Sequence, residues 1–448
     1  MRSKQRNFIE KAEKCKVFYR QQIFAIISRK LDLKPFCRVN SPVFYVRCAM
    51  AELLAPAGNP EKLVWADIYG ADAVYFGVDR FSLRSFAGNF TIDDAAKALE
   101  RLHKNGKKGY ITLNIYPYSG EYKDLVETAG SLAECRADAF IVSDFGVITA
   151  LKKAGLKVPL HISTQANTVS WQTVNAYFDY GAKRVNLARE LSFEKIKEIA
   201  ENKYKEAEIE VFIHGAVCFS MSGRCAISDW LTGRKANRGE CTHPCRWKYA
   251  VVEEKREGEY MPVGEDGRGT YIFNPKELAL FDYVQPLKKL GVDSFKIEGR
   301  MKSIHYVASV VSLYRRILDG EEIPHVEIVR LLNRIKNRGY STGFMKGGVT
   351  PDDYQLAGDG SNSEAEFIAN ITEEKLNGKC VAEIRNHTEA GETVEILEPN
   401  GHTRTYRLPD LLTFTDGTQA LAANHSKFIL LEGDFVPYSI LRRIENRD

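Results

Sequence analysis

Short apolar segments alternate with longer amphipathic segments along the chain, from residue 52 to about residue 320. The apolar segments have the length of strands, and the amphipathic segments carry apolar residues at helical spacing. The sequence therefore predicts strands at Glu52–Ala55, Ala73–Phe76, Lys108–Ile115, Ala139–Ser143, Leu160–Ser163, Arg184–Leu187, Glu208–His214 and Ser294–Ile297. It predicts helices between and after these strands, among them Thr91–Lys104, Phe193–Glu201, Ile304–Leu318 and Val326–Lys336.

Strands that alternate with helices normally pair in parallel and are joined by right-handed crossovers. Similar turns lead into several of them, such as Tyr69-Gly70-Ala71-Asp72 and Leu290-Gly291-Val292-Asp293. Eight strands over about 250 residues predict an α/β fold, a TIM-like (β/α)8 barrel of regular or distorted shape. A doubly wound sheet is the alternative, but the Gly-x-Gly-x-x-Gly fingerprint of dinucleotide-binding sheets does not follow the first strand.

The pattern changes after the last predicted helix. Arg338–Gly348 is rich in glycine and is predicted to be irregular. Short alternating segments follow and predict strands at Phe367–Ile371, Lys379–Ile384, Thr393–Glu398, Thr403–Arg407, Lys427–Leu431 and Ser439–Arg442. The predicted organisation is an N-terminal extension (1–49), a barrel domain (50–340), a linker (341–365) and a small C-terminal β-barrel domain (366–448).

Composition and charge describe an ordinary globular protein with an unusual N-terminus. Hydrophobic residues make up 44% and charged residues 27% of the chain, and no run of 18 apolar residues occurs, so we expect a cytoplasmic protein without a membrane span. Residues 1–49 carry a net charge of +9, which leaves about −5 for the rest of a chain whose net charge is +4. A start codon assigned upstream of the true Met50 is the favoured explanation; a basic arm and a targeting peptide are the alternatives.

Four of the nine cysteines fall within 28 residues, at Cys218, Cys225, Cys241 and Cys245. Their spacing, Cys-x6-Cys-x15-Cys-x3-Cys, lacks the Cys-x2-Cys pairs that are usual in structural zinc sites. Four thiolates around one loop suit an iron–sulfur cluster of the 4Fe–4S type. Zinc and four unrelated buried cysteines remain the alternatives.

The cysteine segment directly follows the strand Glu208–His214. Loops at the carboxyl ends of strands build the active sites of (β/α)8 barrels, so we expect the cysteines at the catalytic face. Basic residues lie between and after them, at Arg224, Arg234, Arg238, Arg246 and Lys248. They either bind an anionic substrate or only offset the charge of the thiolates.

Other polar residues at strand ends are expected to converge on the same face. Arg84, Arg189 and Arg300 could each bind a carboxylate through two parallel hydrogen bonds. His214 and Glu298 are further catalytic candidates because each lies at the end of a predicted strand. The alternative for each arginine is an ion pair with a neighbouring acid, such as Glu190 or Glu298.

Several motifs resemble the collagenase-like peptidase family. They are Glu52-Leu53-Leu54-Ala55-Pro56-Ala57-Gly58, Tyr69-Gly70-Ala71-Asp72-Ala73-Val74-Tyr75, Glu210-x-Phe212-x-x-Gly215-Ala216-Val217-Cys218-x4-Gly223-x-Cys225-x-Ile227-Ser228 and Lys296-Ile297-Glu298-Gly299-Arg300. The runs Arg246-Trp247-Lys248-Tyr249 and Arg338-Gly339-Tyr340-Ser341-Thr342-Gly343-Phe344 are most similar to the prephenate-dependent tRNA uridine hydroxylases within it. This resemblance implies tRNA as substrate and prephenate as cosubstrate. It also leaves open a protein partner of the same family.

The resulting hypothesis is hydroxylation of the wobble uridine of tRNA to 5-hydroxyuridine. A collagenase-like peptidase is the alternative, with Cys218 or Cys225 paired with His214, although the motifs His-Glu-x-x-His and Gly-x-Ser-x-Gly are absent from the sequence. Hydroxylation of ribosomal RNA or of a quinone precursor is a second alternative, and a non-catalytic scaffold, which would have bulky side chains in the barrel mouth, is a third. Basic residues on the helix near residue 330 and at the C-terminal end (Arg330, Arg334, Lys336, Arg338, Lys427, Arg442 and Arg443) either contact RNA or form solvated faces.

Overall fold

The computed structural model describes residues 51–83, 89–218, 220, 225, 227–246, 251–252, 260–261, 264–266, 269–271, 275–349, 353 and 363–444. The N-terminal extension and the candidate Arg84 lie outside these residues, as do Arg224 and Lys248. No helix in the described part of the chain has the length and apolar character that crossing a membrane requires.

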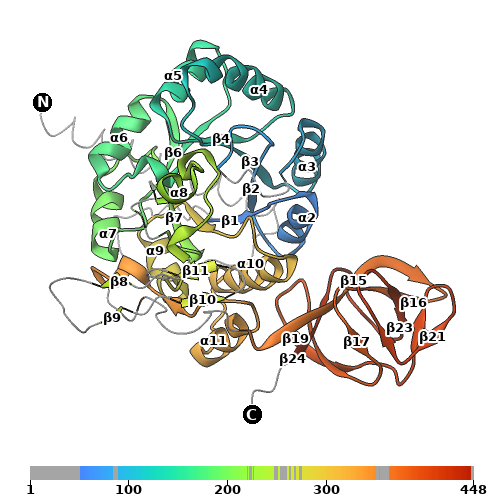
Figure 1. Cartoon of the computed structure of the whole chain (residues 1–448). Coiled ribbons are helices and arrows are strands. Elements are labelled where there is room, and N and C mark those ends of the chain that lie inside the picture. The colour runs from blue at the N-terminus through green and yellow to red at the C-terminus, as the bar shows by residue number, and fades with distance from the viewer. Residues whose placement is uncertain are drawn as a thin grey trace, which may run out of the picture. The chain divides into compact units, whose positions relative to one another are not determined.

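Eight parallel strands form a closed barrel, which confirms the predicted fold class. The strands are β1 (Glu52–Pro56), β2 (Ala73–Gly77), β3 (Lys108–Leu113), β4 (Ala139–Val142), β5 (Leu160–Ile162), β6 (Ala182–Asn186), β7 (Glu208–Gly215) and β13 (Ser294–Ile297). Each strand pairs with the next, and β13 closes the ring by pairing with both β7 and β1. Figure 1 shows the strands at the centre of a ring of helices.

The helices surround the barrel because each presents an apolar face to the strands. They are α2 (Pro60–Ile68), α3 (Ile92–Lys104), α4 (Tyr122–Glu134), α5 (Phe145–Lys153), α6 (Trp171–Asp179), α7 (Phe193–Asn202), α9 (Val284–Lys289) and α10 (Ile304–Leu318), followed by α11 (His325–Asn333). Several begin after a residue whose side chain accepts a hydrogen bond from the first turn; Thr91 and Asp94 form a capping box at α3. Such caps fix where the loops at the barrel mouth end.

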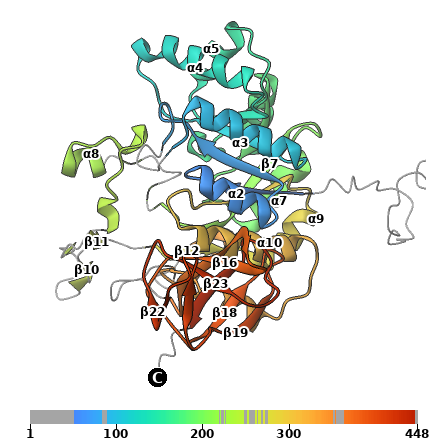
Figure 2. The same cartoon turned by 90° about the vertical axis from the view of Figure 1, so that its right-hand side faces the viewer.

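A long insertion separates β7 from β13. It contains the short helix α8 (Ile227–Thr232), the 3₁₀ turns η4 (Ala236–Arg238) and η5 (Pro244–Arg246), and the strands β8 (Val251–Val252), β9 (Tyr260–Met261), β10 (Gly264–Asp266), β11 (Gly269–Tyr271) and β12 (Glu277–Ala279). In Figure 2, α8, β10 and β11 lie on the same side of the barrel. The insertion therefore carries the cysteine segment at one end of the barrel, as the sequence predicts.

Two strands outside the ring extend the barrel sheet. β12 runs antiparallel to β7, with Leu278 opposite Gly215, and β14 (Tyr340–Ser341) runs parallel to β12. The segment 338–348, which was predicted to be irregular, thus contributes β14 and the turn η7 (Gly343–Lys346) to the wall beside the cysteine segment. These elements bring Ser341 and Phe344 to the barrel mouth.

The C-terminal part forms an antiparallel sheet of eight strands in the order β19-β18-β24-β15-β16-β23-β20-β21. Their bounds are β15 (Ala365–Leu376), β16 (Lys379–Ile384), β18 (Thr393–Leu397), β19 (Thr403–Arg407), β20 (Leu412–Phe414), β21 (Gln419–Ala420), β23 (Phe428–Leu431) and β24 (Ile440–Ile444), with β17 (Thr388–Glu389) and β22 (Ala422–Ala423) as a separate pair. The sheet encloses its own apolar core, centred on residues such as Ile368, Ile396 and Leu441.

Charged side chains are buried inside the lower part of the barrel. Arg184 contacts Glu52 and lies 2.8 Å from Glu208, while Lys296 lies 2.8 Å from Glu210. Burial by itself would raise the pKa of Glu52, but the charge and hydrogen bonds of Arg184 outweigh it and lower the pKa. Because these charges are paired, the barrel tolerates them below the mouth.

Candidate active site at the mouth of the barrel

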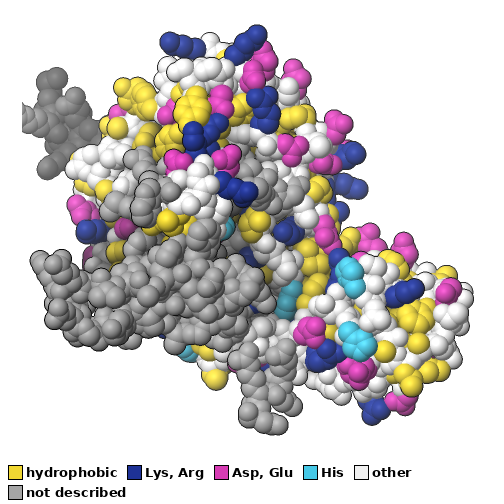
Figure 3. Space-filling view, viewed as in Figure 1, with side chains coloured by type: hydrophobic (Ala, Val, Ile, Leu, Met, Phe, Trp, Pro, Cys, Tyr) yellow, Lys and Arg dark blue, Asp and Glu magenta, His cyan; other side chains and the backbone are white. Residues whose placement is uncertain are grey.

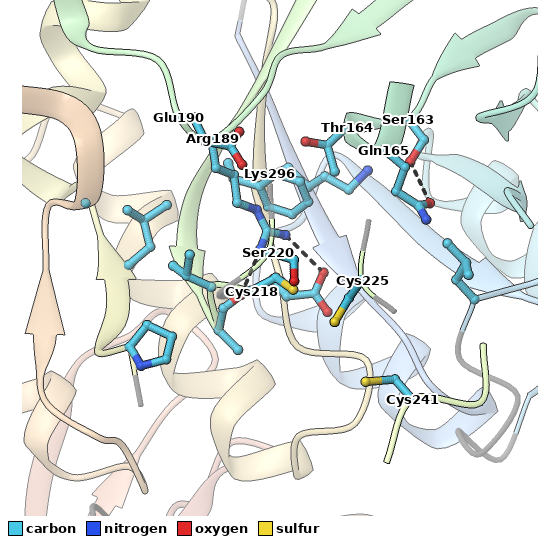
Figure 4. Close-up of a pocket in the computed structure, with 18 of the residues that line it drawn as sticks. Ser163, Thr164, Gln165, Arg189, Glu190, Cys218, Ser220, Cys225, Cys241 and Lys296 are labelled. Carbon is cyan, nitrogen blue, oxygen red and sulfur yellow. Dashed lines mark hydrogen bonds and ion pairs between the residues drawn. The ribbon is translucent and has the colours of Figure 1, made fainter. Parts of the chain in front are cut away.

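A cavity of about 410 Å³ opens at the carboxyl ends of the barrel strands. Its wall combines strand ends, such as Asn186 and Lys296, with the insertion after β7 and the segment around Phe344. All four cysteines of the predicted cluster line it. In the view of Figure 4, Cys218, Cys225 and Cys241 lie below Thr164 and Gln165. This volume lies in the range of small-molecule sites.

None of the four cysteines forms a disulfide bond with another described cysteine. The Sγ atoms of Cys225 and Cys241 each accept a hydrogen bond, from the backbone N–H of Ile227 and His243, at 3.4 Å. The side chains of Cys225 and Cys241 point toward one another (Figure 4). Four cysteine side chains, two of which accept backbone hydrogen bonds at sulfur, fit the ligand set of an iron–sulfur cluster.

A single metal ion is the alternative occupant of the same residues. Among the described residues, no three His, Cys, Asp or Glu side chains are grouped tightly enough to hold one ion. A zinc ion bonds thiolates at about 2.3 Å.

Hydroxyl hydrogen bonds hold the cysteine segment together. The Oγ atom of the fully buried Ser228 accepts a hydrogen bond from the backbone N–H of Thr242 at 3.2 Å, which joins α8 to the segment that carries Cys241. Gly239 ends η4 with a φ of 94°, and a Cβ at this position would lie 2.9 Å from the carbonyl oxygen of Ser82. Only glycine therefore lets η4 pack this closely against the segment after β2.

An aromatic and basic cluster lies at the rim of the cavity. We call Tyr118, Lys235 and Arg238 the rim cluster. Arg238 lies over the Tyr118 ring at 4.3 Å from its centroid, and Nζ of Lys235 donates to the Tyr118 hydroxyl at 2.9 Å. Tyr118 is 55% exposed, and Figure 3 shows basic and hydrophobic side chains side by side on this face of the barrel. The adjacent Ala236 lines the cavity, so the rim cluster borders the cavity entrance.

Four cationic side chains line the cavity, and Lys276 is one of them. Arg300 is 3% exposed, and its Nη1 donates to the hydroxyls of Ser82 and Thr112 at 2.8 and 3.2 Å. Arg189 donates to the carbonyl oxygen of Ala216 at 2.9 Å, and its Nη2 lies 3.7 Å from Glu298. Lys296, also lining the cavity, is the fourth.

The structure thus brings together Arg189, Glu298, Arg300 and the four cysteines around one cavity. The ion pair of Arg189 with Glu298 is the alternative that the sequence left open, and this contact fastens the loop after β6 to the loop after β13. Arg300, in contrast, is fixed by two hydroxyls at the cavity wall. Arg84 lies outside the described residues.

His214, which was predicted as a catalytic residue, is not among the residues that line the cavity. It is buried, its Nδ1 is hydrogen-bonded to the hydroxyl of Tyr314 at 3.2 Å, and its ring contacts the rings of Tyr306 and Tyr340. The cause is a bulge: Lys296 pairs with Phe212, but the next residue, Ile297, pairs with His214. One extra residue in β7 turns His214 to the outer face of the strand, toward α10.

Several amide side chains also line the cavity wall. Asn114 donates to Oε1 of Gln165 at 3.0 Å, and Ser143 donates to the same oxygen at 3.1 Å. Asn186 is the last residue of β6 and also lines the cavity. The sequence placed Asn186 inside a strand that ended at Leu187, and only its position one residue from the strand end could have marked it.

Several of the arginines outside the mouth are paired with acids. Arg330 lies 2.7 Å from Glu327 and 2.8 Å from Glu395, and Arg443 lies 2.6 Å from Glu392. Arg442 is fully buried. These contacts favour a structural role for the arginines that the sequence offered as an RNA-binding face.

A (β/α)8 barrel with four cysteines at its mouth and an antiparallel C-terminal sheet defines a distinct class of protein. The sequence matches the model of Peptidase family U32 over residues 58–354 and that of the Peptidase family U32 C-terminal domain over residues 363–442. The chain therefore belongs to peptidase family U32, which confirms the resemblance to collagenase-like peptidases.

Proteins with similar sequences carry two kinds of name, RNA hydroxylation protein and collagenase. The tRNA hydroxylation protein P of Escherichia coli is 35% identical over 395 residues, covering 78% of this chain and 87% of the relative. A collagenase of Porphyromonas gingivalis is 31% identical and covers 66% of this chain and 73% of the relative. A 23S rRNA 5-hydroxycytidine synthase of Escherichia coli is 34% identical, with 60% of this chain and 39% of the relative covered.

Proposed function

We propose that this protein is an RNA hydroxylase that converts the wobble uridine of tRNA to 5-hydroxyuridine. The names of two relatives, tRNA hydroxylation protein P and the 23S rRNA 5-hydroxycytidine synthase, support RNA hydroxylation as the general activity. Prephenate as cosubstrate, and a 4Fe–4S cluster on Cys218, Cys225, Cys241 and Cys245, complete the proposal.

The observation that carries the proposal is the open cavity lined by both thiols and cations. A non-catalytic scaffold would have its barrel mouth filled by bulky side chains. Instead, the mouth holds a cavity of about 410 Å³ with Arg300 in its wall, while Lys296 beside it is paired with Glu210. Guanidinium groups bind carboxylates, so Arg300 suits a carboxylate of the cosubstrate.

Replacing a C–H bond of uracil by C–OH removes two electrons from the base and adds one oxygen atom. The reaction therefore needs a two-electron oxidant and an oxygen source in addition to the groups of the chain. When bound, an iron–sulfur cluster supplies electron transfer or a Lewis-acidic iron. In the proposal, the four cysteines hold the cluster and Arg300 orients the cosubstrate against the base.

RNA is favoured over peptide as substrate by the rim cluster. Exposed aromatic rings next to cations bind unpaired nucleotides, because bases stack on the ring while the cations contact phosphates. Peptidase chemistry would need a thiol activated by a histidine. His214, the histidine proposed for that pair, faces α10 and lies outside the residues that line the cavity, whereas His243 lines the cavity beside the cysteines.

Hydroxylation of ribosomal RNA is the second candidate because one relative is a ribosomal RNA hydroxycytidine synthase. That relative is covered over only 39% of its length, whereas tRNA hydroxylation protein P is covered over 87%. The greater coverage favours tRNA.

Mass spectrometry of nucleosides from a deletion strain tests the proposal. We expect 5-hydroxyuridine and its derivatives to disappear from tRNA and to return when the gene is restored. Ribosomal RNA hydroxylation should be unchanged. Normal tRNA hydroxylation in the deletion strain, together with cleavage of gelatin by the purified protein, would establish the peptidase instead.

A further inference from the structure

Asn186 holds a buried amide that the fold itself does not use. The residue is 3% exposed, and among the described residues its Oδ1 has no hydrogen-bond partner. A buried amide oxygen without a partner costs free energy, so most are satisfied inside the protein. Asn186 lines the cavity, and a ligand in the cavity is therefore the partner that is missing from the fold.

The neighbouring amides differ from Asn186 in this respect. Asn114 accepts from the backbone N–H of Leu83 at 3.2 Å and donates to Gln165 at 3.0 Å. Gln165 accepts in addition from Ser143 and Ser163, at 3.1 and 3.3 Å. Asn114 and Gln165 are thus held in place by the barrel. Asn186 has the same chemistry, but its carboxamide oxygen is left for a ligand.

The chemistry of a carboxamide narrows the choice of ligand. A carboxamide donates and accepts side by side, and the edge of uracil presents an N3–H donor beside a carbonyl acceptor. A carboxylate ligand would instead choose a cation, and Arg300 provides one in the same cavity. The cavity therefore offers a cation for an anionic cosubstrate and a neutral amide for a neutral heterocycle.

We propose that Asn186 reads the target base, pairing its carboxamide with the N3–H and an adjacent carbonyl of the uracil. This inference rests on the proposed hydroxylation of RNA. Enzymes that modify a base take it out of the stack and bind its pairing edge in a pocket. Asn186 is then a specificity-determining residue of the barrel mouth, separate from the cysteines and from the cations.

Replacing Asn186 by Leu tests whether the amide serves the substrate or the fold. Leu has the same branching as Asn and removes a polar group that the fold leaves unsatisfied. We expect Asn186→Leu to unfold at the same or a higher temperature and to hydroxylate tRNA with kcat/KM reduced at least tenfold. The iron content and the visible absorption of the anaerobically purified protein should be unchanged.

Asn175 provides the matched control. It is also a buried asparagine, but its Oδ1 accepts from the backbone N–H of Tyr204 at 2.7 Å, and it does not line the cavity. Asn175→Ala should lower the unfolding temperature and leave KM for tRNA unchanged. Asn186→Leu should therefore lower kcat/KM without lowering stability, whereas Asn175→Ala should lower stability without changing KM for tRNA.

A chemical change in the substrate identifies the atom that is read. A tRNA carrying 3-methyluridine at the target position lacks the N3–H donor. For the wild-type protein, kcat/KM on this tRNA should be at least tenfold lower than on unmodified tRNA. Asn186→Ala has lost the acceptor and has space for the methyl group. Its kcat/KM should therefore differ by less than threefold between the two tRNAs. Losses that multiply would show that Asn186 and N3–H do not interact.

The proposed function and this inference fail in different ways. If the wild-type protein forms no 5-hydroxyuridine on tRNA, the proposed function is wrong. If the wild-type protein is active and Asn186→Leu keeps its kcat/KM within twofold, the inference is wrong and the function stands. A parallel fall of unfolding temperature and activity in Asn186→Leu would assign Asn186 a structural role and overturn the inference as well.

Discussion

The buried imidazole of His214 couples the stability of the barrel to pH. Burial, the largest cause, lowers the pKa of His214 to about 4, and the charge of Glu277 opposes this only in part. In the unfolded chain, histidine titrates near pH 6.5. Between these values the unfolded chain binds a proton that the folded chain does not, so stability is lost as the pH falls through this window.

Replacing His214 by Phe should weaken this dependence on pH. His214 contributes a loss of about 2 kcal/mol in the free energy of unfolding between pH 7.5 and pH 5, at about 1.36 kcal/mol per pKa unit. Phe fits among the surrounding tyrosines, and the Tyr314 hydroxyl keeps its bond to the carbonyl oxygen of Ile213 at 3.0 Å. Urea unfolding of both proteins at the two pH values measures the difference. An equal pH effect in the variant would contradict the assignment.

Arg300 is the residue on which binding of the cosubstrate should depend most. A hydrogen bond between charged groups contributes about 1.5–3 kcal/mol, so Arg300→Ala should raise KM for prephenate at least tenfold and abolish 5-hydroxyuridine formation at low prephenate. Arg300→Lys should restore little, because an ammonium group cannot reproduce the planar fork of a guanidinium. Absorption of the cluster should be unchanged in both variants. An unaltered KM for prephenate would place the cosubstrate elsewhere.

At the scale of elements, the insertion after β7 has one clear test. Anaerobically purified protein should be brown, with about four irons per chain for a cluster held by four thiolates. Changing any one of Cys218, Cys225, Cys241 or Cys245 to Ala should bleach the protein. Cys380→Ala, which alters a buried cysteine of the C-terminal sheet, is the control and should keep the colour. Stoichiometric zinc in place of iron would rule the cluster out.

The rim cluster should contribute to binding of RNA through Tyr118. Stacking of one base on an aromatic side chain is worth about 1–3 kcal/mol, so Tyr118→Ala should raise KM for tRNA about fivefold or more, and Tyr118→Phe should raise it much less. Tyr180→Ala is matched in exposure, at 52%, but Tyr180 ends α6 and is not part of the rim cluster. Filter binding of tRNA at two salt concentrations measures the effect. Equal loss in the Tyr180 variant would mean that the contact is not specific to the rim.

The main elements of the fold could be predicted because their sequence signals are local. The strands of the barrel are apolar segments buried on both faces, and α10 was predicted at its observed bounds, Ile304–Leu318. Strands β12 and β14 were not predicted, because segments of three and two residues carry no periodicity and form only by pairing with β7 and with each other.

The same distinction applies to the site. The cysteines, Arg189, Glu298 and Arg300 could be found because residues at strand ends converge in a barrel. The orientation of His214 depends on a bulge between β7 and β13, which is a property of pairing across 84 residues and leaves no local trace. The unsatisfied amide of Asn186 likewise exists only because its neighbours in space leave its oxygen without a donor.

For the whole molecule, charge limits where RNA can bind. The chain carries a net charge of +4, of which residues 1–49 supply +9, so the remainder is slightly acidic. Arginines of α11 and β24 are neutralised by Glu327, Glu392 and Glu395. Contact with the phosphates of tRNA must then depend on local cations such as Lys235 of the rim cluster, since Arg238 is paired with Glu121. The affinity should fall with salt by a shallow slope.

The barrel should fold without residues 1–49. The first strand, β1, begins at Glu52, whose backbone N–H donates to the carbonyl oxygen of Asp293 at 2.9 Å and whose carboxylate accepts from the Tyr110 hydroxyl at 2.6 Å. A chain that starts at Met50 keeps both contacts. We expect it to unfold at the same temperature as the full chain and to restore 5-hydroxyuridine in the deletion strain.

A chain that starts at Asn59 is the matching control, because it lacks β1. Its absence would leave β13 and β2 without their shared neighbour and open the barrel, and buried backbone groups without partners are costly. This shorter chain should be insoluble or unfolded by circular dichroism. If the chain from Met50 also lost solubility or activity, residues 1–49 would be a functional part of the protein, and the upstream start would be genuine.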